Sequence, residues 1–98
     1  MKLKNNLVLD NFLANNGVEC ENHSKNLWID KYGMLLNYGT IIAFFYNGNL
    51  YLNKTKYSAT TSKHQNYIRR NYPNIIEIDR EEVYDLSTKL VQEYWASK

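Results

Sequence analysis

Short apolar runs alternate with turn residues through the middle of the chain. The runs at 27–29, 34–36 and 40–46 are rich in branched and aromatic side chains, which favour β-strands. Asn47–Gly48 separates the third run from another at 50–52, and this dipeptide supplies the two positive φ angles of a type I′ turn. The pattern predicts an antiparallel meander with a β-hairpin as its clearest feature.

One helix is expected before these runs and one after them. Apolar residues at three- and four-residue spacing predict one over 7–16, before Gly17. The Ser-x-x-Gln pattern of Ser62 and Gln65 matches a capping box, with Thr61 as a competing N-cap. The second helix is therefore predicted from Ser62 to about residue 71, because Pro73 forbids its continuation.

The last quarter of the chain predicts a strand and then a regular amphipathic helix. The strand covers 74–79, and Asp79 caps the helix that follows. Acids crowd the first turn of this helix, which suits the helix dipole. Its apolar residues recur every three or four positions: Val83, Leu86, Leu90, Val91 and Tyr94.

These elements predict one α+β domain over residues 1–98. We expect a small antiparallel sheet of three to five strands, packed on one face against the helix from Ser62 and the C-terminal helix. The segment 18–26 is expected to be irregular, and 57–58 to form a short strand. A chain of 98 residues has room for one small core.

Cysteine content and hydropathy limit the class of protein. One cysteine cannot form an internal disulfide or a four-thiolate metal site, which points to a reducing compartment or to a protein indifferent to redox conditions. No apolar run approaches the roughly 20 residues of a membrane span. We therefore expect a soluble, cytoplasmic protein with no membrane association.

Charge is segregated along the chain. Residues 31–76 carry six basic residues and no acid, whereas residues 77–98 carry six acids and three bases. The middle is also rich in tyrosine, a side chain that stacks on nucleic-acid bases. An acid-free basic block is typical of a phosphate-facing surface, and an ordinary solvated face is the alternative.

The helix from Ser62 separates this charge onto one side. Ile68, Tyr72 and His64 fall together and can dock on the sheet. The opposite side carries Lys, Arg, Asn and Tyr, which hold phosphates, hydrogen-bond adenine or stack on a base. The residues predicted to bind nucleic acid or a partner are Lys54, Lys56, Lys63, Asn66, Tyr67, Arg69 and Arg70.

Catalytic and metal-binding patterns are incomplete. Cys20 and His23 have the spacing of two metal ligands, but a zinc site needs three or four and no second pair follows. His64 lies near the hydroxyls of 60–62, yet residues 31–76 hold no acid to orient it. We predict no catalytic residue, no metal and no cofactor. A metal-free nuclease that uses His23 and His64 is a third hypothesis.

The segment Tyr57–Arg70, which reads YSATTSKHQNYIRR, carries a resemblance. It resembles a YSxTTSKHQNxIRR segment in small uncharacterised phage and mobile-element proteins of low-GC Gram-positive bacteria. Together with the predicted β-hairpin before it, which includes Leu50–Asn53, the resemblance covers roughly the central third of the chain, and residues 1–30 and 74–98 lie outside it. It implies a genomic setting and no particular reaction. The setting is similar to that of phage inhibitors of host defence, which include anti-CRISPR proteins.

Two functional hypotheses follow. The first is a non-enzymatic, phage-type accessory protein that binds nucleic acid, or a nucleic-acid-handling host defence complex, through the basic helix. The second is an anti-CRISPR-like inhibitor whose acidic C-terminal helix mimics nucleic acid through Glu81, Glu82, Asp85 and Glu93. The expected partners are nucleic acid, a host nucleic-acid-binding protein or both, and a homodimer is a further expectation.

Overall fold

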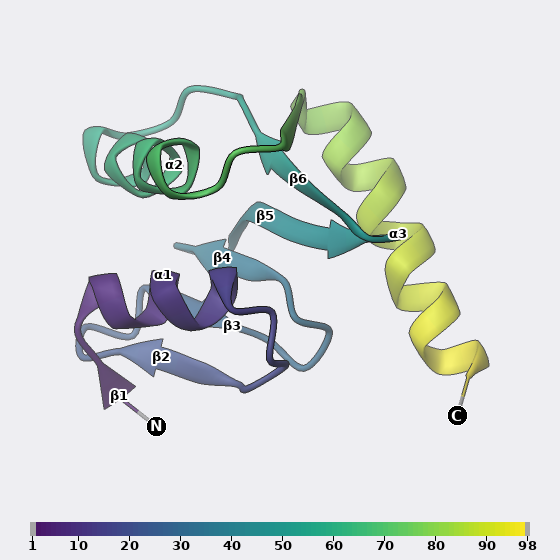
Figure 1. Cartoon of the computed structure of the whole chain (residues 1–98), viewed down its shortest axis with the longest axis horizontal. Helices are drawn as coiled ribbons and strands as arrows, with labels where there is room; N and C mark the ends of the chain where they lie inside the picture. The colour runs from purple at the N-terminus through teal and green to yellow at the C-terminus, as the bar shows by residue number, and fades with distance from the viewer. Residues whose placement is uncertain (1, 98) are drawn as a thin grey trace.

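The computed structural model describes residues 2–97, and within them a mixed sheet carries helices on both faces (Figure 1). The seven strands lie side by side in chain order. The elements are β1 (Lys2–Leu3), α1 (Asn5–Leu13), β2 (Cys20–Asn22), β3 (Leu27–Ile29), β4 (Leu35–Asn37), β5 (Thr40–Tyr46), β6 (Asn49–Asn53), α2 (Ala59–Asn71), β7 (Ile75–Ile78) and α3 (Arg80–Ala96). The predicted α+β class is confirmed.

The β5–β6 hairpin forms where the sequence predicts it. Tyr46 and Asn49 are paired across the two strands, so Asn47 and Gly48 are the two turn residues. Their φ angles are +50° and +79°, as a type I′ turn requires. Gly48 adopts this conformation without the steric cost that a Cβ would add.

The sheet is larger than expected. Strands β3 to β6 form the predicted antiparallel meander, and β2 extends it by one more antiparallel strand. β1 and β7 add parallel partners at its two edges. Strand β2 lies inside the segment 18–26 that was expected to be irregular. β2 has only three residues, too few to show the alternation of apolar and polar side chains that marks a strand in the sequence. It forms because Cys20 and Glu21 pair with Ile29 and Trp28 of β3.

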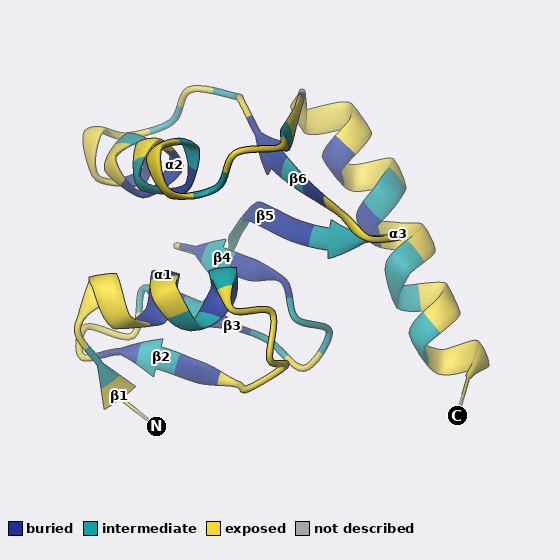
Figure 2. Ribbon diagram, in the orientation of Figure 1, coloured by how far each residue is buried: buried dark blue, intermediate teal, exposed yellow. Residues whose placement is uncertain are grey.

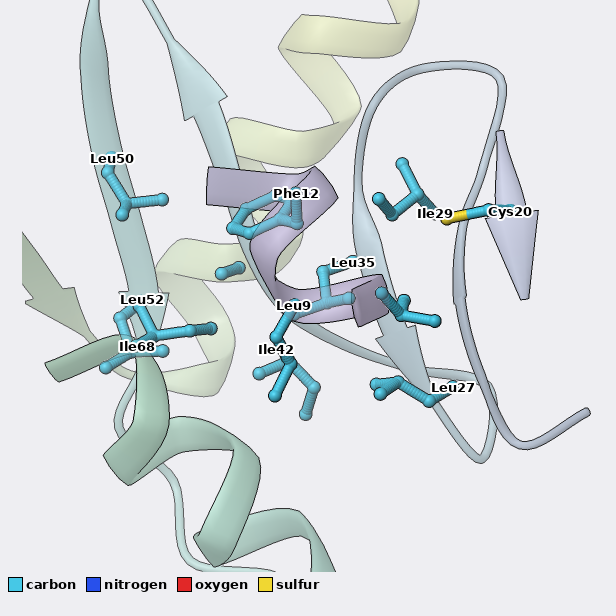
Figure 3. Packing of buried hydrophobic residues seen from close by; sticks show 12 residues of the cluster. Leu9, Phe12, Cys20, Leu27, Ile29, Leu35, Ile42, Leu50, Leu52 and Ile68 are labelled. Atoms are coloured by element: carbon cyan, nitrogen blue, oxygen red, sulfur yellow. The ribbon is translucent and has the colours of Figure 1, made fainter. Parts of the chain in front are cut away.

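The helices lie on opposite faces of the sheet, so the prediction that α2 and α3 share one face is wrong. α1 and α2 cover one face, where Leu9, Phe12 and Ile68 pack with Leu50 and Leu52 (Figure 3). α3 covers the other face over β5 and β6 (Figures 1 and 2). Alternate residues of the strands point to opposite faces, and both faces of this sheet carry apolar side chains. Each face therefore has to be covered by a helix to keep those side chains from water.

α3 follows the prediction closely. The side chain of Asp79 accepts a 2.9 Å hydrogen bond from the backbone N–H of Glu82, as an N-cap does. Val83 packs with Met34, Phe44 and Ile78 in the second core. At the other end of α3, the indole of Trp95 donates a 3.0 Å hydrogen bond to the hydroxyl of Tyr32. α3 therefore reaches from the end of β7 to the β3–β4 turn.

The remaining differences concern element boundaries. α1 begins two residues before the predicted start and ends at Leu13, and Asn15 adopts a φ of +50° just after it. Residues 57–58 form no strand, because Ser58 caps α2 instead. No helix in the described part of the chain has the length and apolarity that crossing a membrane requires.

Candidate nucleic-acid interface

α2 begins earlier than its sequence pattern predicts. Ser58 has extended backbone angles, and its hydroxyl accepts a 3.2 Å hydrogen bond from the N–H of Thr61, so it is the N-cap. The predicted Ser62–Gln65 capping box is therefore wrong, as is an N-cap at Thr61. The helix ends at Asn71, before Pro73, as predicted.

The inner face of α2 is buried and mostly polar. Thr61, His64, Gln65 and Ile68 are spaced to lie on one side, and all four are buried. The Thr61 hydroxyl donates a 2.6 Å hydrogen bond to Oδ1 of Asn37 at the end of β4. The predicted inward direction of His64 and Ile68 is confirmed. Much of the YSATTSKHQNYIRR segment thus holds α2 against the sheet.

Gln65 explains why the capping box does not form. Its side-chain amide donates to the backbone carbonyls of Asn53, at 2.7 Å, and Thr55, at 3.0 Å. These carbonyls lie at the end of β6 and just after it, where a carbonyl shielded from water needs a donor from the protein. The side chain therefore supports the loop 54–58 and does not turn back to its own helix end.

His64 is a buried imidazole with an unsatisfied nitrogen. The residue is 5% exposed, and its Nε2 has no hydrogen-bond partner in the described structure. Burial lowers the pKa of His64 below its usual value, so the ring is neutral at pH 7. His23, by contrast, is exposed after β2. The two histidines named in the nuclease hypothesis therefore have opposite environments.

The outer face of α2 carries Lys63, Asn66 and Arg70, and all three are exposed. Their spacing of three and four residues places them along one stripe of the helix. Within residues 2–97, the ion pair that forms joins Arg69 to Glu77, so neither Lys63 nor Arg70 is paired with a carboxylate. Two cations on this stripe are free to contact phosphate.

Lys54 and Lys56 lie on the loop that leads into α2, and both are exposed. The loop backbone is anchored, because the N–H of Lys54 donates to the carbonyl of Ile78 at 2.8 Å and that of Thr55 donates to Oδ1 of Asn53 at 3.0 Å. We call Lys54, Lys56, Lys63, Asn66 and Arg70 the basic surface.

Two of the predicted binding residues are directed elsewhere. Tyr67 is half-buried against the first core, and its hydroxyl donates a 2.5 Å hydrogen bond to Asp10 of α1, which raises the pKa of Tyr67. The guanidinium of Arg69 bonds to Glu77 at 2.7 Å and to Oδ1 of Asn66 at 2.8 Å. Both side chains are therefore occupied within the chain.

The acidic residues of α3 lie on the opposite side of the sheet from the basic surface. Glu81, Glu82 and Asp85 are exposed, and Tyr84 beside them is 73% exposed. Glu93 accepts a hydrogen bond from the hydroxyl of Tyr46. The fold thus separates the two surfaces that the sequence proposes.

The Cys20–His23 pair does not form part of a metal-binding group. Cys20 is buried beside Ile29 (Figure 3), and burial raises the pKa of its thiol. The described residues hold no group of three or more His, Cys, Asp or Glu side chains that would bind a metal ion.

Sequence reasoning missed an open groove of about 750 Å³ beside Trp28. It is lined by Glu19, Cys20, Glu21, Lys25, Trp28, Ile29, Asp30, Lys31 and Tyr32. The sequence did carry a signal for it. In the predicted strand 27–29, Leu27 and Ile29 point to one face and are buried, so Trp28 between them must point to the other face, where it is half-exposed. The aromatic ring faces the side of the sheet away from α1.

A protein-family model matches residues 1–85. The chain belongs to the family of unknown function DUF8033. The match ends within α3, so the whole sheet, α2 and the basic surface lie inside it. No curated protein matches the chain, and no solved structure does.

Proposed function

We propose that this protein binds nucleic acid, without catalysing a reaction on it, through the basic surface. The observation that supports this proposal most is the stripe of Lys63, Asn66 and Arg70 on a helix whose other side is fixed to the sheet. Lysine and arginine supply phosphate contacts, and a rigid helix presents them at fixed spacing. Lys54 and Lys56 extend the charge along the preceding loop.

Asn66 gives this surface a means of contacting bases. Arg69 donates to its Oδ1, which fixes the side-chain amide in one orientation and leaves its N–H₂ group directed away from Arg69. An asparagine held in this way can donate to acceptors on a base edge. Arg69 in turn is held by Glu77. In this proposal Arg69 is a positioning residue and contacts no phosphate itself.

The number of cations predicts a steep dependence on salt. If Lys54, Lys56, Lys63 and Arg70 each neutralise one phosphate of duplex DNA, affinity falls about 100-fold between 50 and 200 mM salt. This response distinguishes phosphate contact from the stacking of exposed tyrosines, which is far less sensitive to salt.

The test is binding of the purified protein to fluorescent single- and double-stranded DNA and RNA at both salt concentrations. We expect the Lys63→Glu/Arg70→Glu double variant to lose binding to the preferred nucleic acid. The matched control is Lys2→Glu/Lys89→Glu, which makes the same change in net charge at exposed lysines outside α2.

Two results would contradict the proposal. One is no binding to any of the four nucleic acids at 50 mM salt. The other is an equal loss of affinity in both double variants, because binding would then depend on net charge alone. The first result would favour the second hypothesis, an inhibitor that acts through Glu81, Glu82 and Asp85 of α3.

A further inference from the structure

The groove beside Trp28 lies on the face of the sheet that carries α3, in the part that α3 leaves open. Trp28 pairs across the sheet with Leu36, which packs in the core beneath α3, and on its other side with Glu21. Cross-strand neighbours point to the same face. Trp28 is half-exposed, belongs to neither hydrophobic core and lines the groove.

The groove is lined by three carboxylates and by two lysines, Lys25 and Lys31. Glu19, Glu21 and Asp30 line the groove, and none of them has an ion-pair partner within residues 2–97. Oδ1 of Asp30 accepts 2.9 Å hydrogen bonds from the N–H groups of Tyr32 and Met34, which fixes the carboxylate in place. Burial raises the pKa of Asp30, and the neighbouring charge of Glu19 adds to the rise. A cation entering the groove would relieve this repulsion.

The rim of the groove already contains a cation held by aromatic rings. The ammonium of Lys31 lies 4.7 Å from the ring centre of Trp95 and 5.3 Å from that of Tyr32. The ring of Trp28 has no such cation from the described chain. A partner's guanidinium could therefore stack on Trp28 and pair with Glu21, which lies beside it.

We propose that this groove binds an arginine-bearing segment of a partner protein, with a guanidinium stacked on Trp28 and paired with Glu21. The three carboxylates outnumber the two lysines of the groove, and Lys31 is already held by Trp95 and Tyr32, so the charge disfavours a phosphate backbone in the same place. The groove and the basic surface lie on opposite faces of the sheet, so one molecule could hold nucleic acid and a protein together. This inference does not depend on the proposed function.

The test uses short peptides and the two tryptophan indoles of the chain as NMR reporters. The probe is an acetylated Gly-Arg-Gly-Arg-Gly peptide, and its control carries citrulline in place of arginine, which keeps the shape and removes the charge. We expect the arginine peptide to shift the Trp28 indole and the Glu21 and Asp30 amide signals saturably, and the citrulline peptide to bind at least about tenfold more weakly.

Variants locate the binding. We expect Glu21→Gln to weaken the arginine peptide about threefold and Trp28→Leu about tenfold, as loss of an exposed ion pair and of a cation–π contact would do. The control Glu81→Gln removes an exposed acid on α3 and should change nothing. Since Glu21→Gln is nearly isosteric, it tests the proposal even if Trp28→Leu unfolds.

Three outcomes would overturn the proposal. The arginine peptide could fail to shift the Trp28 indole, the citrulline peptide could bind equally well, or Glu21→Gln and Glu81→Gln could have the same effect. Displacement of the arginine peptide by oligothymidylate in the Lys63→Glu/Arg70→Glu background would instead assign the groove to nucleic-acid bases.

Discussion

Thr61 and Asn37 join α2 to the sheet through a hydrogen bond between two buried side chains, 24 residues apart in sequence. The Thr61 hydroxyl donates to Oδ1 of Asn37 at 2.6 Å, and the amide of Asn37 donates to the carbonyl of Asn26 at 2.7 Å. Asn22, Asn37 and Asn53 end β2, β4 and β6, and all three are buried. Buried asparagines thus lie where these three strands end, and α2 begins after the last of them.

The first prediction concerns the contribution of the Thr61 hydroxyl to stability. Thr61→Val should lower the free energy of unfolding by about 1–3 kcal/mol, because Oδ1 of Asn37 stays buried without its donor. Urea unfolding followed by circular dichroism measures the change. The control is Thr60→Val, at an exposed position on the same turn. An equal loss in both variants would show that only helix propensity had changed.

The position of the α2 N-cap can be tested separately. Ser58→Ala should destabilise the protein by about 1 kcal/mol, because the N–H of Thr61 loses its acceptor. Ser62→Ala removes the cap that the sequence pattern favours and should be nearly neutral, since residue 62 lies within the helix. Thermal unfolding of the two variants compares them, and a larger effect at Ser62 would contradict this assignment.

His64 predicts a dependence of stability on pH. Burial holds its pKa in the folded protein below the usual value of 6.5, so the unfolded chain binds a proton more readily. Stability from this group is therefore complete above about pH 6.5 and declines as the pH falls toward the lowered pKa. Urea unfolding at pH 7.5 and 5.5 measures the decline.

A matched pair of variants assigns that pH dependence to His64. His64→Gln should reduce the difference in unfolding free energy between the two pH values, whatever its effect on stability at pH 7.5. His23→Gln, at an exposed position, should leave the difference as it is in the original protein. Equal pH dependence in all three proteins would contradict a buried, neutral His64.

Arg69 and Arg70 are adjacent in sequence, but only Arg70 belongs to the basic surface. In the proposed function, Arg70→Ala removes a free cation, so it should weaken nucleic-acid binding at all sequences and reduce the salt slope by about 1. Arg69→Ala should leave the salt slope almost unchanged, because Arg69 is paired with Glu77. Fluorescence anisotropy over a salt series measures both slopes, and a larger change for Arg69→Ala would assign phosphate contact to that residue instead.

Several features follow from the sequence alone because their causes lie within a few residues. Asn47–Gly48 adopts the turn that its conformational preferences favour, and Asp79 caps the helix that starts beside it. The inward position of Ile68 follows from helical periodicity. Local geometry decides these features, so a single sequence is sufficient to predict them.

Other features depend on residues that are distant in sequence. β2 forms through its pairing with β3, and the side of the sheet that α3 covers depends on apolar surface contributed by several strands. The hydroxyl of Tyr67 reaches Asp10 across 57 positions, and the inward turn of Gln65 depends on carbonyls at the end of β6. Sequence alone therefore identified a basic helix and its charges. Only the tertiary structure decided which of those charges stay free, because that depends on which acids and carbonyls the fold brings beside them.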